Sequence, residues 1–148
     1  MRTQNPSDLL SKGQEKISVI ARTSVYSDLD LLFTPNPVTG DINPIKDIEA
    51  IKKSVINLIS TNFYERPFQP EIGCGVRGLL FEPADPITIS DLEDAAKEVL
   101  ENFEPRVRVL QVSAVDDADN NAYTMTIYFQ ILSTEQVAEV TTVLERLR

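Results

Sequence analysis

The segment 122–132 constrains the fold more than any other part of the chain, because two sets of residues alternate along it from Tyr123 to Ile131. The apolar positions are Tyr123, Met125, Ile127, Phe129 and Ile131. The positions between them are Thr124, Thr126, Tyr128 and Gln130. A period of two is that of a β-strand with one buried and one exposed face. The pattern therefore predicts a strand that presents one face to the core.

A helical period governs the segment that follows residue 43. Asn43 suits the position before a helix, Pro44 suits its first turn, and Asp47 complements the partial positive charge there. The apolar residues that follow share one side of a helix: Ile48, Ile51, Val55, Leu58 and Ile59. This spacing predicts a helix with one face on the core.

A second helix is expected to begin at Ser90, because Ser90 and Glu93 have the spacing of a capping box. Its apolar residues again share one side: Leu92, Ala95, Ala96, Val99, Leu100 and Phe103. Pro105 ends this helix, since the residue before a proline is biased away from helical geometry. Between the two helices lies a long loop, 63–86, that is rich in proline and glycine. Loops of this length within small domains are often functional.

The rest of the chain completes an α+β pattern. A short strand is expected over 26–33, and another after Pro105, where the period changes to two. The tail 135–148 fits either a helix or an edge strand from its residues alone. Its valines and leucines match a helical stripe, but the run 140–144 is rich in β-branched valine and threonine, which favour a strand. Together the elements predict a small antiparallel or mixed sheet with two main helices packed on one face. One domain is expected over 25–148, after an N-terminal arm, 1–24.

Composition removes several classes of function. The 148 residues include no histidine and a single cysteine, Cys74. These absences exclude a histidine-based catalytic triad, a histidine-ligated zinc site and an intrachain disulfide. The net charge of −9 disfavours nucleic acid and anionic membrane as partners. The sequence shows no apolar run as long as a signal-peptide core or a membrane span, so we expect a cytosolic protein.

The remaining catalytic option is a pair of carboxylates. Glu65, Glu71, Glu82 and Asp85 lie along the long loop, and two carboxylates suffice for glycoside hydrolysis. The glycines around Cys74 match no phosphate-binding motif. No cofactor and no metal ion is expected.

The sequence Glu104-Pro105-Arg106 stands at the junction between the second helix and the strand that follows. Proline fixes the turn and so holds both flanking side chains in defined directions. Two interpretations stay open from the residues alone. Either the two charges form a salt bridge that steadies this corner, or Arg106 presents its planar guanidinium to a partner's carboxylates or carbonyl oxygens.

Several short motifs resemble, in their order and spacing, a known family. They are Asp28-Leu-Asp30 with Phe33, Thr39-Gly-Asp41-Ile42, Ala50-Ile-Lys-Lys-Ser-Val-Ile56, Thr61, Glu65-Arg-Pro-Phe68, Pro70-Glu-Ile-Gly73, Leu80-Phe-Glu82 and Glu104-Pro-Arg-Val107. The set resembles the baseplate wedge family of contractile phage tails, which includes the TssE subunit of type VI secretion. The resemblance runs from Asp28 to Ile131 and leaves the arm 1–24 outside.

The resemblance implies a non-enzymatic, structural subunit of the virion tail baseplate, assembled in the host cytoplasm. Members of the family sit one in each of six wedges around the tail tube or hub. They hold the bundle formed by the larger wedge proteins and offer β-structure on which the tail sheath protein assembles. The resemblance further implies that Glu104, Pro105 and Arg106 face the wedge bundle.

The same resemblance favours a strand for the tail of the chain, since an edge strand offers unpaired backbone groups to another protein. The expected edge includes Val140, Thr142 and Leu144.

The family has also been labelled lysozyme-like, and this label supplies an alternative function, that of a peptidoglycan-cleaving glycosidase that uses the loop carboxylates. The other alternative is the equivalent baseplate subunit of a type VI secretion or tailocin system.

Overall fold

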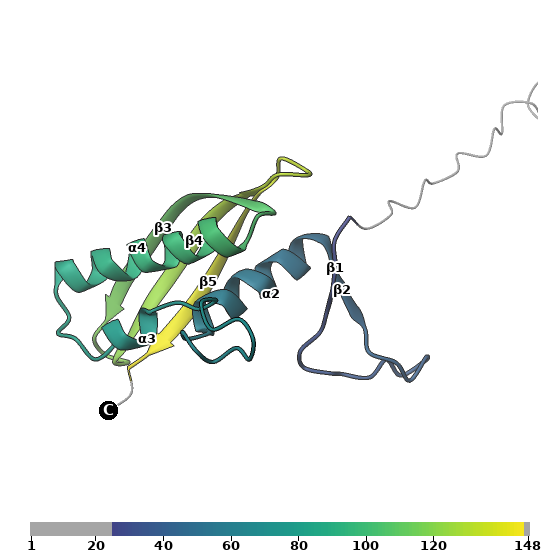
Figure 1. Ribbon diagram of the computed structural model, residues 1–148, viewed down its shortest axis with the longest axis horizontal. Coiled ribbons are helices and arrows are strands. Elements are labelled where there is room, and N and C mark those ends of the chain that lie inside the picture. The colour runs from purple at the N-terminus through teal and green to yellow at the C-terminus, as the bar shows by residue number, and fades with distance from the viewer. Residues whose placement is uncertain (1–24, 147–148) are drawn as a thin grey trace, which may run out of the picture.

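The computed structural model describes residues 25–146 and consists of two layers. One layer is a three-stranded sheet, and the other is a pair of helices that cover one of its faces (Figure 1). The strands are β3 (Val107–Asp117), β4 (Ala122–Ile131) and β5 (Val137–Glu145), and the helices are α2 (Asp47–Ser60) and α4 (Pro86–Phe103). The expected α+β class is confirmed. The expected arm, 1–24, lies outside the described residues, as do 147–148.

The middle strand of the sheet is β4, and both of its pairings are antiparallel. The five apolar side chains predicted to share a face are each at most 1% exposed. They pack with the buried stripes of α2 and α4 in one core. Burial of a large apolar side chain is worth about 1.5–3 kcal/mol, so this strand anchors the hydrophobic layer. None of the helices within 25–146 has the length and apolar content needed to cross a bilayer.

The C-terminal segment is a strand, as the resemblance implied. Val140 of β5 pairs with Ile127 of β4, and Leu144 pairs with Tyr123. Val140 is buried, while Thr142 and Leu144 are half-buried, on the face that the helices cover. A helix here would leave the backbone groups along this edge of β4 without partners, which explains why the strand alternative is adopted.

The helix α2 begins later than the sequence predicts. Asn43 and Pro44 do not open it, because Pro44–Lys46 forms the strand β2, which pairs with β1 (Ser27–Leu29) in a separate two-stranded sheet. Asp47 is the first helical residue, and its carboxylate accepts hydrogen bonds from the two amides that precede β1. Pairing with a distant strand overrides a helix signal that is only local. β1 is also shorter than the strand expected there.

The helix α4 begins one turn before the expected capping box. Asp85 is its N-cap, and the carboxylate accepts the amide of Thr88 at 2.8 Å. A proline fills the first helical position, which suits it because no hydrogen-bond donor is needed there. Ser90 therefore lies inside the helix. Glu93, expected to close the box, instead accepts the amide of Ala114 on β3 at 2.8 Å.

The long loop between the two main helices folds back on itself and contains a four-residue helix, α3 (Val76–Leu79). The amide of Cys74 donates to the carbonyl of Thr61 at 2.7 Å, which closes the part of the loop that lies between α2 and α3. Gly73 lies so close to Asn62 that a Cβ on it would stand 2.5 Å from the Asn62 backbone. Only glycine permits this approach.

Gly73→Ala should destabilise the protein by about 2–3 kcal/mol, because its methyl group would overlap the neighbouring backbone. Gly78→Ala is the matched control, since no atom lies within 4 Å of a Cβ at Gly78. Alanine in α3 should be neutral or slightly stabilising. Urea unfolding of both variants checks the prediction, and equal free energies of unfolding would contradict the close approach.

Candidate partner-binding surfaces

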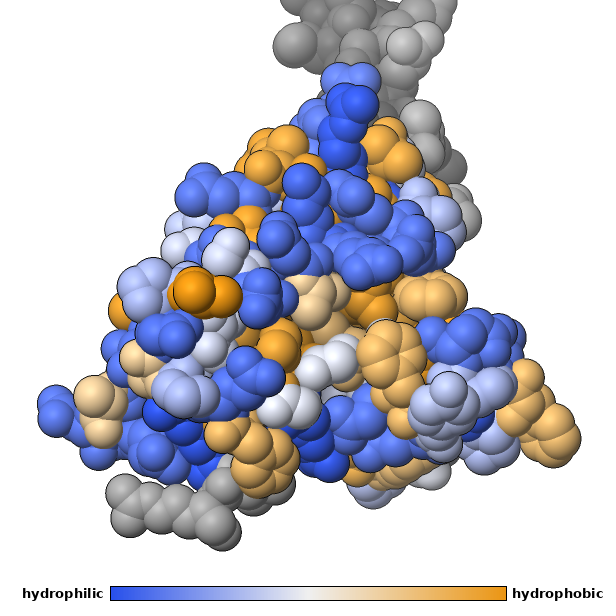
Figure 2. Space-filling model, turned by 60° about the vertical axis from the view of Figure 1, so that its left-hand side comes forward, coloured by the Kyte–Doolittle hydropathy of each residue, from blue (hydrophilic) through white to orange (hydrophobic). Residues whose placement is uncertain are grey.

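Apolar area alone does not mark an interface on the face drawn in Figure 2. Hydrophobic side chains there lie in several groups, one of them across the middle of the face, with hydrophilic side chains around them. The segments singled out from the sequence, 104–106 and β5, are distinguished instead by charge and by backbone hydrogen bonding.

The corner 104–106 joins the end of α4 to the start of β3. Glu104 follows the last helical residue and is only 2% exposed. Its carboxylate accepts two hydrogen bonds from the Arg106 guanidinium, with Nε–Oε1 at 2.6 Å and Nη2–Oε2 at 2.7 Å. It accepts a third from Ser54 Oγ on α2 at 2.5 Å. One buried carboxylate thus fixes the end of α4 to the flank of α2.

Arg106 also reaches β1. Its Nη1 donates to Asp28 Oδ2 at 3.2 Å, and its guanidinium carbon lies 5.6 Å from the centre of the Tyr26 ring. The guanidinium therefore ties the two-stranded sheet to the main domain. These contacts correspond to the interpretation of the corner as an internal salt bridge. The contact to a wedge bundle stays a prediction, and Pro105 is the most exposed of the three residues.

The charges of the corner stabilise each other. Burial raises the pKa of Glu104, but the hydrogen bonds from Arg106 and Ser54 outweigh this effect, so the pKa lies below the usual 4.5. The hydrogen-bonded carboxylate of Glu104 in turn raises the pKa of Arg106. Both groups are charged at neutral pH, and removal of either one would leave the other without its main partner.

A depression of about 380 Å³ opens beside the corner. It lies between α2, the corner and the loop after α2, and Asn57, Arg66 and Pro105 are exposed residues of its lining. Two guanidinium groups, those of Arg66 and Arg106, line this one depression in a chain of net charge −9. Such a place suits carboxylate or carbonyl oxygens of a partner.

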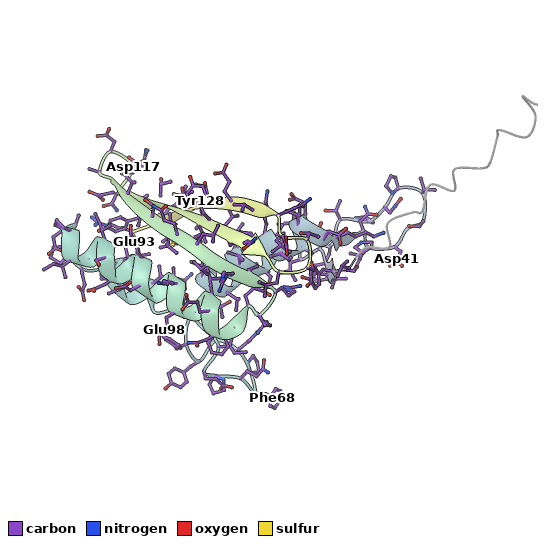
Figure 3. All side chains as sticks on the ribbon, turned by 90° about the horizontal axis from the view of Figure 1, so that it is seen from above. Asp41, Phe68, Glu93, Glu98, Asp117 and Tyr128 are labelled. Carbon is purple, nitrogen blue, oxygen red and sulfur yellow. The ribbon has the colours of Figure 1, made fainter. Side chains whose placement is uncertain are left out.

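The two edges of the sheet differ in how open they are. On β3, Glu93 caps the amide of Ala114, and a bulge interrupts the pairing at Leu110. Figure 3 shows Glu93 on α4 alongside β3. Both features hinder the addition of a further strand. The pairing of β5 with β4 is continuous over 137–145, and among the described residues no side chain caps a β5 amide.

Two hydrogen bonds give the direction of the backbone groups along β5. The amide of Ile131 donates to the carbonyl of Gln136, and the amide of Arg146 donates to the carbonyl of Asn121. Since backbone groups alternate in direction along an antiparallel strand, the even-numbered residues point toward β4. The odd-numbered residues point toward the open edge: Val137, Glu139, Thr141, Val143 and Glu145.

The three β5 residues expected at the edge lie between these open positions. Val140, Thr142 and Leu144 direct their backbone groups to β4 and their side chains to the covered face. The groups available to another chain therefore belong to their odd-numbered neighbours. The sequence alternation could not distinguish the two sets, because it reports side-chain burial and not the hydrogen-bonding register.

Two of the four loop carboxylates, Glu65 and Asp85, accept backbone hydrogen bonds. Glu65 accepts the amide of Asn62 at 2.8 Å, and this hydrogen bond lowers the pKa of Glu65. Asp85 caps α4, and the amide it accepts lowers its pKa too. A general acid needs a raised pKa. Glu71 and Glu82 are exposed.

Two partners of the corner are not apparent from local sequence. Ser54 precedes Glu104 by 50 positions, and Asp28 precedes Arg106 by 78. Both residues belong to segments that carry the family resemblance. That resemblance is the one signal in the sequence that could have indicated them.

Glu104→Gln should destabilise the protein at pH 7 by about 2 kcal/mol, because it removes a carboxylate that accepts charged hydrogen bonds. The pKa of Glu104 is lower in the folded state than in the unfolded state, so its contribution is complete above about pH 5 and declines as the pH falls through the folded-state pKa. The difference in the free energy of unfolding between wild type and variant should therefore shrink as the pH falls below about 5. Urea unfolding of both proteins at several pH values measures this difference. A difference independent of pH would contradict the lowered pKa.

The chain matches the family described as "Baseplate wedge protein gp25" over residues 46–136. It is 30% identical to the baseplate wedge protein gp25 of Enterobacteria phage T4 over 108 residues, which are 73% of this chain and 81% of that protein.

Solved structures share the fold. A Geobacter sulfurreducens protein described as a tail lysozyme is 25% identical, with a TM-score of 0.63 over 66% of this chain and 89% of that one. A chain of the anti-feeding prophage baseplate is 18% identical, with a TM-score of 0.58 over 83% of this chain and 87% of that one. A chain of the pyocin R2 baseplate is 18% identical, with a TM-score of 0.52 over 81% of this chain and 98% of that one. Because the family match spans more than half of the sequence and the T4 relative aligns along most of it, the chain belongs to the gp25 family of baseplate wedge proteins.

Proposed function

We propose that the protein is a non-enzymatic subunit of a contractile-tail baseplate that binds the wedge proteins through the corner 104–106 and starts sheath assembly through the edge of β5. The observation that carries the proposal is the presence of a charge-fixed corner and an open strand edge in one domain of this family. Its place is the tail baseplate of the virion, and other baseplate proteins are its partners. Six copies, one per wedge, would surround the tail tube or hub.

The corner suits a protein contact although its charges are paired internally. The guanidinium of Arg106 has five N–H donors, and Glu104 and Asp28 receive hydrogen bonds from Nε, Nη1 and Nη2. One donor on each terminal nitrogen is left for a partner's oxygen. The side chain of Arg106 is 23% exposed and already oriented, so binding does not have to order it. The neighbouring depression gives room for inserted side chains.

The edge of β5 suits a strand supplied by the sheath protein. Five residues direct unpaired amides and carbonyls outward, and each hydrogen bond that a new strand forms is worth about 0.5–1.5 kcal/mol. The strand has no proline and no break in register. An open edge of this kind favours aggregation, so its retention is consistent with a partner that covers it.

Peptidoglycan cleavage is the alternative, because one structural relative is described as a tail lysozyme. The lowered pKa values of Glu65 and Asp85 argue against either as a general acid. The structural role is therefore preferred. A type VI secretion or tailocin baseplate would use the same two surfaces.

Co-purification with the wedge proteins of the same tail tests the corner. Arg106→Ala alone is a poor test, because it leaves Glu104 buried without its partner at a cost of about 3–5 kcal/mol. The paired change Glu104→Leu with Arg106→Met removes both charges at similar volume and should keep the fold. We expect this variant to melt cooperatively and to lose the wedge complex.

A matched control removes another pair of opposite charges. Glu49→Gln with Lys52→Gln deletes a 3.6 Å pair on the surface of α2 and should leave the complex intact. A folded corner variant that still co-purifies would show that the site is wrong. A wild-type protein that binds no wedge protein would refute the proposed function, and a peptidoglycan-cleavage assay would then follow.

Val143→Pro should block sheath recruitment while preserving the fold. Its amide points away from β4, so proline removes one open donor and no hydrogen bond of the existing sheet. Thr142→Pro is the control that should destabilise the fold instead, because Thr142 pairs with Met125. Thermal melting and co-sedimentation with sheath protein distinguish the two effects. Normal sheath recruitment by folded Val143→Pro protein would refute strand sharing.

A further inference from the structure

The loop between α2 and α3 exposes three aromatic side chains that the contacts above do not use. Phe63, Tyr64 and Phe68 are 50%, 85% and 101% exposed. Figure 3 shows Phe68 at the tip of this loop, away from the sheet. Aromatic rings contribute heavily to burial energy, so three exposed rings on one short loop indicate a surface that another molecule covers.

Two of these aromatic residues have an unfavourable backbone conformation. The φ angle is 66° at Tyr64 and 69° at Phe68. Bulky side chains rarely adopt this left-handed region, because the Cβ crowds the carbonyl that follows. Stability alone would favour glycine or asparagine at both positions. Unfavourable conformations that are retained in a fold concentrate at functional sites.

The loop holds this conformation through its own hydrogen bonds. The Glu65 carboxylate accepts the amide of Asn62 at 2.8 Å and the Asn62 side-chain Nδ2 at 3.1 Å. The amide of Tyr64 donates to the carbonyl of Pro70 at 2.9 Å and closes the tip. The backbone that carries the rings is thus held in place before any partner arrives, which lowers the entropic cost of binding.

The same loop reaches the corner. Arg66 lies between Tyr64 and Phe68 in the sequence, and it lines the same depression as Glu104, Pro105 and Arg106, so the loop that carries the rings borders the corner through Arg66. Within 25–146, Arg66 takes part in no salt bridge, although the chain has a net charge of −9. An exposed guanidinium beside aromatic anchors suits a partner that brings a carboxylate.

We propose that the loop 62–70 is a second anchor of the wedge interface. Tyr64 and Phe68 insert into an apolar pocket of a wedge protein, and Arg66 pairs with a carboxylate beside that pocket. The inference rests on the proposed wedge contact at the corner, with which the loop shares its depression. Tyrosine, phenylalanine and arginine are side chains enriched at the centres of protein interfaces.

Tyr64→Asn with Phe68→Asn tests the proposal, because asparagine tolerates left-handed backbone and removes the rings without adding strain. The melting temperature should stay unchanged or rise, while the affinity for the purified wedge proteins falls about 100-fold. Arg66→Ala should weaken binding about tenfold. Glu135→Asn is the matched control, since Glu135 is exposed and has a φ of 55° in the turn before β5. It should leave the affinity unchanged.

The outcomes separate this inference from the function on which it rests. Unchanged wedge affinity of the folded double variant, with the corner variant unable to bind, would overturn the inference and leave the proposed function in place. Loss of sheath recruitment with normal wedge binding would also overturn it, because the rings would then serve another partner. Absence of any wedge complex with wild type would refute the wedge contact itself. Phe68→Asn alone, at a fully exposed position, gives the same measurement if the double variant does not fold.

Discussion

The buried carboxylate of Glu104 joins three parts of the chain that are distant in sequence. It accepts hydrogen bonds from Arg106 at the start of β3 and from Ser54 on α2, and through Arg106 it holds Asp28 on β1. A buried carboxylate is costly unless it is paired, so the positions of these elements depend on one another. The sheet β1–β2 needs such support, since an isolated pair of strands is only marginally stable in water. The group that holds the fold together therefore also fixes the orientation of Arg106.

A second constraint is the asymmetry of the sheet. The edge at β3 is closed by Glu93 and by a bulge, whereas β5 directs the backbone groups of its odd-numbered residues outward. A sheet with one closed and one open edge can extend in one direction only. In the proposed assembly this gives the protein two separate surfaces, with the corner belonging to β3 and the open edge to β5.

Much of the core can be predicted from the sequence, because one-sided burial leaves a direct periodic mark, as it does in 122–132. The start of α2 cannot be predicted in this way, because Asn43 and Pro44 carry a local helix signal that the pairing of β2 with β1 overrides. The corner likewise has a part that the sequence predicts and a part that it does not. The motif 104–106 is visible as a charged corner, but Ser54 and Asp28 meet it only through the fold. The left-handed backbone under the exposed rings has no sequence signal either, because neither position is glycine or asparagine.

An electron cryomicroscopy structure of an assembled baseplate that contains this chain would test both proposed surfaces at once. We expect a strand of the sheath protein to pair with β5, and an oxygen of a wedge protein to lie within hydrogen-bond distance of Arg106. A baseplate in which β5 remains an open edge and the corner faces solvent would refute both proposed contacts.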